Sequence, residues 1–137
     1  MKFKTLNEQM DIIKKGVEEI LPEDQLVDKI NKSISTSIPL NIKLGCDPSM
    51  PDLHLGHSVV LKKLRDFQNL GHNVTLVIGD FTAMIGDPTG RNKTRPQLDM
   101  NTAKDNADTY IEQASKILYI DKLRVVYNSE WLSKLDF

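Results

Sequence analysis

Apolar residues change their spacing several times along this chain, and each spacing predicts a different element. Near the N-terminus they recur three and four positions apart, at Leu6, Met10, Ile13, Val17 and Ile20. This spacing predicts an amphipathic helix that ends before Pro22. A second, shorter helix is expected around Leu26 and Ile30, followed by a polar, β-branched connector over residues 33–39.

Three strand-like patterns follow, separated by two helix-like patterns. Alternating apolar residues over 40–44 predict the first strand, with Gly45 beginning the next loop, and residues 123–127 predict the third. The second, over 74–78, is a nearly continuous apolar run of the kind that is covered on both faces in a parallel sheet. Helices are expected between the strands, over 57–70 with Gly71 as the C-terminal cap, and over about 103–118.

The alternation of strands and helices indicates an α/β fold with a Rossmann-like parallel sheet, preceded by an N-terminal helical segment. Two parts are expected: residues 1–38, whose helices pack on the core, and residues 39–137, which form the first half of a Rossmann-like domain. Ligands of such sheets bind outside the carboxyl ends of the strands. The regions to inspect are therefore residues 45–57, residues 79–95 and the residues from Asn128 onward.

Composition narrows the class of protein. The 137 residues are 39% hydrophobic and 27% charged with a net charge of -1, which describes one globular domain and argues against a dedicated nucleic-acid module. No apolar run approaches the ~20 residues of a membrane span, and no signal peptide precedes Met1. Cys46 is the only cysteine, so an intramolecular disulfide and a cysteine-based zinc site are excluded and a reducing cytoplasm is expected. At a strand end, Cys46 is expected to be a small buried hydrophobe.

Two histidines three residues apart stand where the first strand is followed by a helix. In the first turn of that helix His54 and His57 would share one face, and Gly56 between them leaves the backbone bare for a flat ligand. The free N–H groups and the positive dipole end of a helix start favour a phosphate there. With only Asp52 nearby a zinc shell is short of ligands, so no metal site is expected. Taken alone, the two histidines also fit a solvated surface pair, whereas His72 is expected to be structural.

A second polar segment, Asp87-Pro88-Thr89-Gly90, comes after the second strand. A carboxylate at a strand end can pair with a substrate ammonium group, although these four residues also have the usual composition of a type I turn. The basic residues Arg91, Lys93 and Arg95 follow. Basic loops of this sort close over a leaving pyrophosphate or form a solvated charge cluster.

Together, residues 43–57 and 78–90 resemble the N-terminal half of the catalytic domain of bacterial tyrosyl-tRNA synthetases, which are class I aminoacyl-tRNA synthetases. The resemblance extends from about Ile42 to Trp131. His54-Leu55-Gly56-His57 resembles the class I "HIGH" motif, which the tryptophanyl enzyme and adenylyl-transferring nucleotidyltransferases share. The Gly86-Asp87-Pro88-Thr89-Gly90 loop narrows the resemblance to tyrosine. The implied fold is the nucleotide-binding half of a HUP-type catalytic domain.

The resemblance implies ATP-dependent activation of L-tyrosine to tyrosyl-adenylate, followed by transfer to tRNA(Tyr). ATP would bind as its Mg²⁺ complex, with no metal held by the chain itself. For full-length members it implies a cytoplasmic homodimer that binds tRNA through parts outside this chain and does not bind a membrane. The implied roles are phosphate stabilisation by His54 and His57, ATP binding by Gly45, Asp47, Pro48 and Gly56, tyrosine binding by Asp87, Thr82 and Lys43, and a pyrophosphate loop at Arg91 and Arg95.

Two departures from the family pattern limit what is carried over. Lys43 stands where some tyrosyl enzymes have a tyrosine that contacts the substrate hydroxyl. No Lys-Met-Ser-Lys-Ser-like motif occurs, and the chain stops at Phe137. We therefore expect a truncated catalytic half that is inactive alone and whose uncovered sheet favours self-association. The alternatives are a stand-alone nucleotide- or adenylate-binding module, and a half that docks onto a separately made second half.

Overall fold

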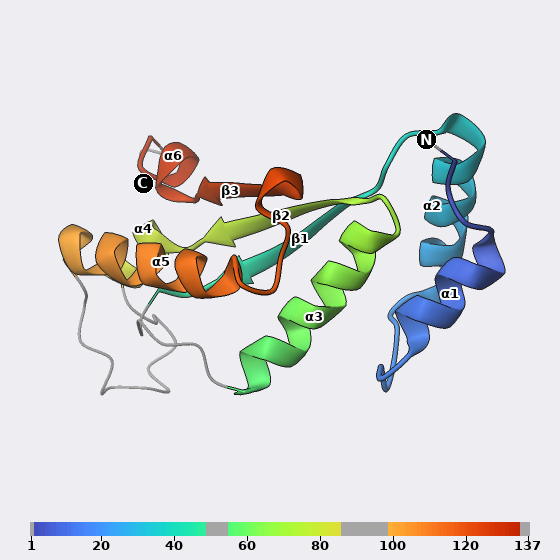
Figure 1. Cartoon of the computed structure of the whole chain (residues 1–137). Helices are drawn as coiled ribbons and strands as arrows, with labels where there is room; N and C mark the ends of the chain where they lie inside the picture. Colours follow the sequence, from blue (N-terminus) through green and yellow to red (C-terminus); the bar gives the residue numbers. More distant parts are fainter. Residues whose placement is uncertain (1, 49–54, 86–98, 135–137) are drawn as a thin grey trace.

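Three parallel strands in the order β1-β2-β3 form the sheet of the molecule (Figure 1). The computed structural model describes residues 2–48, 55–85 and 99–134. The strands are β1 (Asn41–Cys46), β2 (Asn73–Ile78) and β3 (Leu123–Tyr127). The sheet and the helices that precede it confirm the predicted Rossmann-like α/β fold.

Helices surround this sheet unevenly. Figure 1 shows α3 and α5 below the sheet, while α1 and α2 form a pair beyond the amino ends of the strands. The carboxyl ends of β2 and β3 point the other way, toward α4 and α6. The helices are α1 (Leu6–Lys14), α2 (Glu23–Thr36), α3 (Leu55–Asn69), α4 (Asp80–Ile85), α5 (Met100–Ala114) and α6 (Ser129–Leu132), with a 3-10 turn η1 at Ile120–Lys122.

One face of the sheet forms the core of the molecule. Leu76 in the central strand is fully buried and lies in register between Leu44 and Val125. Its neighbours from below come mainly from α3 and α5, which contribute Leu61, Leu64, Phe67, Ala107, Tyr110 and Ala114 to the same cluster.

The other face of the sheet is less covered than the sequence predicts. Lys43 and Arg124 are exposed there, and Thr75 and Val77 of the central strand are only half-buried. The expectation that β2 is covered on both faces is therefore wrong for the described part of the chain. The apolar run over 74–78 has strictly alternating burial instead.

The first helix is shorter than its apolar spacing predicts. Thr5 and Glu8 form a capping box that starts α1, but the helix ends at Lys14. Gly16 follows with a φ of +74°, a left-handed conformation that glycine adopts without steric cost and that stops a helix. Val17 and Ile20 are therefore outside α1, although Ile20 still packs against the core.

The second helix is longer than predicted and takes up part of the expected connector. α2 has 14 residues against 9 in α1, and residues 33–36 belong to it. The hydroxyls of Ser35 and Thr36 donate to the Lys32 carbonyl at 3.0 and 2.7 Å, which lets these residues occupy the last helical turn. The chain leaves the helix at Ser37, where φ is +57°.

Later elements follow the sequence prediction more closely. β3 has the predicted bounds, and Gly71, with a φ of +94°, stands just beyond the end of α3. Three details differ. Gly45 lies within β1, paired with Val77, and α5 ends at Ala114, so the last residues of the predicted helix over about 103–118 are outside it. Residues 80–85 form the short helix α4 that periodicity did not indicate. Six residues are too few to show a helical period in the sequence.

α3 is held from both sides by polar contacts that reach across the chain. The Lys63 ammonium donates to the carbonyls of Ile12 and Lys15 at 3.1 and 2.8 Å, at the end of α1. The buried Gln68 amide donates to the carbonyls of Tyr119 and Lys122 and accepts from the Tyr119 N–H. These contacts fix the helix whose first turn contains His57.

His72 joins the N-terminal segment to the sheet, in the structural role expected for it. Its Nδ1 accepts from the Leu40 N–H at 3.1 Å, so its Nε2 bears the proton and donates to Gln9 Oε1 at 2.8 Å. Phe3 stacks on the ring with centroids 5.4 Å apart. Burial lowers the pKa of His72. The buried ring is therefore neutral near neutral pH.

A pH dependence of stability follows from this neutral histidine. The folded-state pKa of His72 lies below its ordinary value of 6.5, so the unfolded chain binds the proton more readily. Stability is full above about pH 6.5 and falls as the pH drops toward the folded pKa, with a slope of at most about 1.4 kcal/mol per pH unit. Urea unfolding of the chain between pH 8 and pH 5 measures this slope. His72→Gln is expected to flatten it, and an unchanged slope in that variant would contradict the assignment.

In the described ranges, no helix is both long and apolar enough to span a membrane.

Candidate functional site

The carboxyl ends of the three strands lie side by side and continue their pairing beyond the sheet. The Gly79 N–H donates to the Cys46 carbonyl at 2.8 Å, and the Asn128 N–H donates to the Ile78 carbonyl at 2.8 Å. The segments that follow the strands are thus brought to one edge. This is the edge where the sequence places the candidate site.

The start of α3 presents the second histidine of the motif. Gly56 is exposed and His57 is half-buried in the first turn. The His57 ring lies edge-on to the Tyr110 ring of α5, with centroids 6.0 Å apart and planes at 70°. His54 lies outside the described residues, so the shared face of the two histidines stays a prediction.

Tyr110 also reaches the end of β1, where its hydroxyl group interacts with the Cys46 thiol. Burial raises the pKa of the Cys46 thiol, and the interaction with Tyr110 only partly opposes that effect. Burial also raises the pKa of Tyr110. Both groups are therefore protonated at neutral pH, which agrees with the expectation that Cys46 is a buried hydrophobe rather than a reactive thiol.

The end of β1 and the residues after it combine an open position with a buried one. A Cβ added at Gly45 would have no atom within 4 Å, so its surroundings are open. Asp47 is exposed, whereas Pro48 is fully buried. The Pro48 carbonyl accepts from the Asn106 amide of α5 at 2.9 Å, a contact that the sequence did not indicate. Pro48 is therefore held against α5, and any contact with ATP stays a prediction.

Lys43 and Thr82 are the two described members of the predicted tyrosine site. Lys43 is exposed and lies two positions before Gly45 in β1. Because side chains alternate along a strand, the two residues share one face of the sheet. Thr82 is exposed in α4, and its hydroxyl donates to the Gly79 carbonyl at 3.0 Å. The remaining predicted residues, Asp87, Arg91 and Arg95, lie outside the described residues.

A polar cluster that the sequence did not predict joins the ends of β2 and β3. We call Asp80, Thr82, Asn128 and Ser129 the strand-end cluster. The buried Asp80 carboxylate accepts from the Ser129 N–H at 3.0 Å and from the Ser129 hydroxyl at 2.6 Å. Asn128 accepts from the Phe81 N–H at 3.0 Å and donates to the Thr82 hydroxyl at 3.2 Å.

These cluster residues could have been found by one local signal, a polar residue directly after a buried strand. Two of the predicted ligand regions, residues 79–95 and the residues from Asn128 onward, include these positions, but the sequence pattern does not single out Asp80. The electrostatics of the cluster extend to Tyr127, whose pKa is raised by burial and then by the carboxylates of Asp108, Asp80 and Glu130. Within the described part of the chain no group of three or more histidine, cysteine, aspartate or glutamate side chains is arranged to hold a metal.

The parallel sheet, the helix that starts with Gly56 and His57 after β1, and the polar strand ends define a Rossmann-like protein with its candidate site at the carboxyl edge. Residues 35–137 match the family described as tRNA synthetases class I (W and Y), and the chain belongs to that family. The resemblance inferred from the HIGH-like motif is thereby confirmed.

Curated relatives match the whole chain. It is 53% identical over 137 residues to the tyrosine-tRNA ligase of Salinibacter ruber, covering 100% of this chain and 33% of that protein. It is 56% identical over 137 residues to the tyrosine-tRNA ligase of Chlorobaculum tepidum, covering 100% of this chain and 34% of that protein. The chain thus spans about a third of the length of these relatives.

Solved structures share the fold. Tyrosyl-tRNA synthetase from Archaeoglobus fulgidus, complexed with L-tyrosine, superposes with a TM-score of 0.77 at 21% identity, over 95% of this chain and 37% of that one. The enzyme from Aeropyrum pernix superposes with a TM-score of 0.72 at 20% identity, over 91% of this chain and 35% of that one. At these identities the similarity establishes the fold alone.

Proposed function

We propose that this chain contributes the ATP-binding part of the active site of a tyrosyl-tRNA synthetase. The observation that supports it best is the identity of more than half of the residues, over the entire chain, with relatives named tyrosine-tRNA ligase. The proposed reaction is the activation of L-tyrosine by ATP, followed by transfer of the tyrosyl group to tRNA(Tyr). The site of action is the cytoplasm.

The chemistry of activation suits the residues at the carboxyl edge. The tyrosine carboxylate oxygen attacks the α-phosphorus of ATP, a bond from that oxygen to phosphorus forms, and the bond to pyrophosphate breaks. A carboxylate is already ionised at neutral pH, so the step needs positioning and charge stabilisation rather than a general base. His54 and His57 supply donors to the phosphates, and Gly56 lets adenosine approach the backbone.

The other predicted residues bind the nucleotide, the tyrosine or the pyrophosphate. Asp47 and the open space at Gly45 accommodate the nucleotide beside β1, with Mg²⁺ arriving on the phosphates of ATP. Asp87 pairs with the tyrosine ammonium group, helped by Thr82. Lys43, two positions before Gly45 in β1, is the third residue of the proposed tyrosine site. Arg91 and Arg95 close over pyrophosphate. Recognition of tRNA and a homodimeric state belong to the proposal for the whole enzyme.

Tyrosine-dependent exchange between ATP and pyrophosphate tests this function. The protein expressed from its complete gene is expected to catalyse exchange with tyrosine and not with tryptophan, the other substrate class of the family. Exchange that responds to tryptophan, or none with either amino acid, would contradict the proposal. ATP binding without any exchange would instead favour the alternative, a nucleotide-binding module descended from a synthetase.

Gly45→Ala separates a ligand-binding role from a structural one. Glycine inside a strand is less stable than alanine by roughly 0.5–1 kcal/mol, and the added Cβ would have no atom within 4 Å, so the melting temperature is expected to stay the same or rise. ATP binding is expected to weaken about tenfold, because the methyl group occupies space proposed for the nucleotide. Calorimetric titration with ATP and thermal melts measure the two effects. Unchanged ATP affinity would remove Gly45 from the site.

A further inference from the structure

The strand-end cluster has hydrogen bonds whose direction can be assigned at every member. The Phe81 N–H can only donate, so the Asn128 atom 3.0 Å away is its amide oxygen. The Asn128 NH₂ group therefore faces the Thr82 hydroxyl, 3.2 Å away, and donates to it. The orientation of Asn128 follows from its neighbours rather than from a free choice of amide rotamer.

The Thr82 hydroxyl consequently has a fixed polarity. Its single proton is donated to the Gly79 carbonyl at 3.0 Å, and one of its two lone pairs accepts from Asn128. The described part of the chain supplies no donor for its second lone pair, and Thr82 is exposed. Toward a ligand, this hydroxyl can therefore only accept a hydrogen bond.

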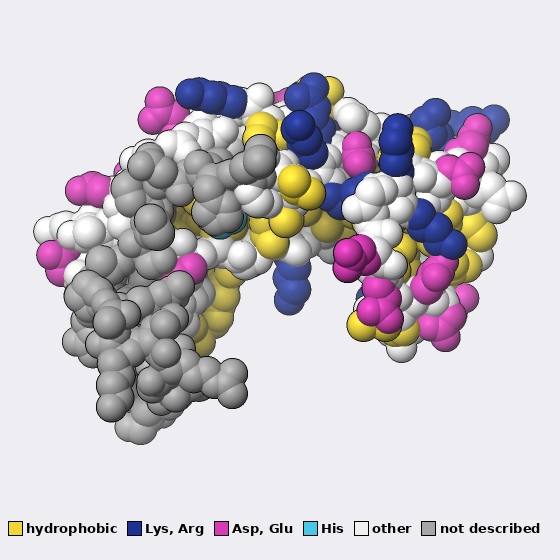
Figure 2. Space-filling view, turned by 90° about the horizontal axis from the view of Figure 1, so that it is seen from below, with side chains coloured by type: hydrophobic (Ala, Val, Ile, Leu, Met, Phe, Trp, Pro, Cys, Tyr) yellow, Lys and Arg dark blue, Asp and Glu magenta, His cyan; other side chains and the backbone are white. Residues whose placement is uncertain are grey.

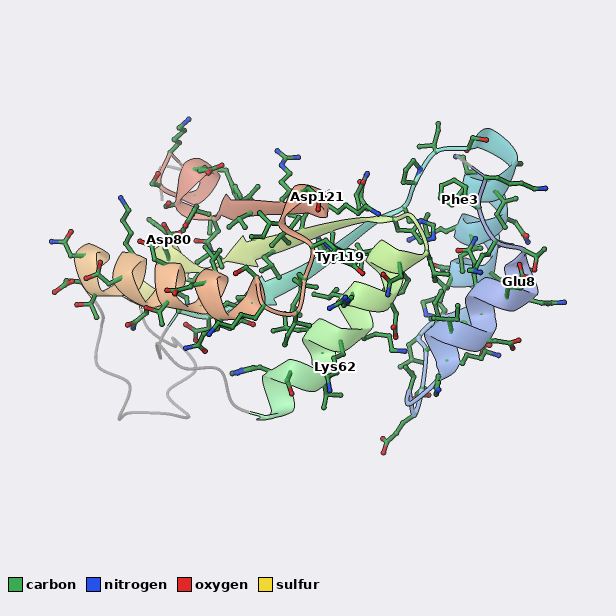
Figure 3. The ribbon with its side chains drawn as sticks, in the orientation of Figure 1. Phe3, Glu8, Lys62, Asp80, Tyr119 and Asp121 are labelled. Atoms are coloured by element: carbon green, nitrogen blue, oxygen red, sulfur yellow. The ribbon has the colours of Figure 1, made fainter. Side chains whose placement is uncertain are left out.

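Asp80 holds the groups that impose this polarity. It is 5% exposed at the first residue of α4, and Figure 3 shows it at the end of the sheet where β3 leads into α6. Its Oδ1 accepts from the N–H groups of Phe81 and Ser129 at 2.9 and 3.0 Å, and its Oδ2 accepts from the Ser129 hydroxyl at 2.6 Å. Both oxygens of this side chain act as acceptors, which suits three converging donors. It fixes the residues on both sides of the contact between Phe81 and Asn128.

We propose that Asp80 is a positioning residue that, through Ser129 and Asn128, presents the Thr82 hydroxyl as a hydrogen-bond acceptor and so selects a ligand with an ammonium group. This inference rests on the proposed function, because the ligand in question is the amino acid. Gly79 is part of the same device: a Cβ at this position would lie 2.7 Å from Thr82 Oγ1. The hydroxyl can approach the Gly79 carbonyl closely only because this residue is glycine.

The test compares L-tyrosine with 3-(4-hydroxyphenyl)propionate, which lacks only the amino group. The ratio of their dissociation constants, measured calorimetrically on the product of the complete gene, reports selection for the ammonium. Thr82→Val is expected to lower this ratio about tenfold, since hydrogen bonds to charged groups are the stronger ones. Asp80→Asn and Ser129→Ala are expected to lower it about threefold or more, while Thr82→Ser, which keeps a hydroxyl, restores most of it.

Two matched controls accompany these variants. Asp121→Asn makes the same chemical change at the exposed η1 turn, at the far end of β3 from Asp80 (Figure 3). Thr109→Val removes a hydroxyl that donates to the Asp105 carbonyl within α5. Both are expected to leave the ratio unchanged, because among the described residues no hydrogen bond links either side chain to the strand-end cluster.

The outcomes separate this inference from the proposed function. If tyrosine supports exchange but Asp80→Asn and Ser129→Ala keep the wild-type ratio, Asp80 has no positioning role and the inference is overturned while the function stands. If both ligands weaken equally in these variants, the cluster is merely structural and the inference is again overturned. Absence of tyrosine-dependent exchange in the wild-type protein overturns the function and the inference together. Should Asp80→Asn fail to fold, Ser129→Ala decides, since it removes a single hydroxyl.

Discussion

Replacing His57 with alanine is expected to slow tyrosyl-adenylate formation by about a hundredfold or more, with little change in tyrosine affinity. Removing one preorganised donor to a developing charge typically costs on the order of 3 kcal/mol of transition-state stabilisation. His57 stands in the first turn of α3, which Lys63 and Gln68 fix against α1 and the segment before β3. A donor on so firmly held a helix needs no rearrangement when charge develops.

The measurement is single-turnover adenylate formation by the protein from its complete gene, with thermal melts in parallel. His54→Ala is expected to give a similar loss in rate. A modest fall in melting temperature is expected for His57→Ala, because the edge-on contact with Tyr110, worth about 0.5–1.5 kcal/mol, is lost. Tyr110→Phe is the control: it keeps the ring beside His57 and removes only the hydroxyl. Unchanged activation kinetics in His57→Ala would contradict the phosphate-binding role.

Figure 2 shows apolar side chains on the underside of the molecule, seen from below, interspersed with lysines, arginines and acidic residues. Exposed apolar residues include Val59 and Val60, at 62% and 43% exposure in α3, the helix that also presents His57. They share α3 with the fully buried Leu61. α3 thus has one face toward the core and another that is exposed.

The sequence predicted those parts of the fold that depend on local pattern. Apolar runs located all three strands. Gly71 marked the end of α3, because the chain leaves the helix through a left-handed backbone conformation that glycine adopts readily. The same reasoning failed in the first helix, where Val17 and Ile20 continue the apolar period but Gly16 has already turned the chain. One residue in a left-handed conformation ends a helix even where the apolar spacing continues beyond it.

The candidate site shows a different limit. Histidines, glycines and the resemblance to the synthetases led to the predicted ligand-binding residues, including His57, Gly45 and Thr82. The pairing of Asp80 with Ser129 could not be predicted, because the two residues lie 49 positions apart and nothing in the local sequence of either indicates the other. Residues predicted to contact ligand can be recognised from motifs, whereas residues that hydrogen-bond between two strand ends depend on pairings of distant parts of the chain.

The second large effect is expected for the core. Leu76→Ala should lower the free energy of unfolding by about 3 kcal/mol, within the usual range for a buried leucine replaced by alanine. Leu76 is 0% exposed in the central strand, with Leu44 and Val125 beside it in register, so strands on both sides restrict collapse around the cavity. Urea unfolding of the chain, followed by the fluorescence of its single tryptophan, Trp131, measures the loss.

Leu21→Ala is the matched control, because the same atoms are removed from a side chain that is 80% exposed. Its expected effect is within about 0.5 kcal/mol, as for other surface substitutions. Equal losses in the two variants would show that the central strand is not the buried strand of the sheet. A loss confined to Leu76→Ala would instead tie the stability of the chain to β2, the strand whose carboxyl end leads directly into Gly79, Asp80 and the candidate site. Substitutions in the core would then lower the free energy of unfolding and also disturb the carboxyl edge of the sheet, to which β2 leads. Gly45→Ala, by contrast, would change ATP affinity without lowering stability.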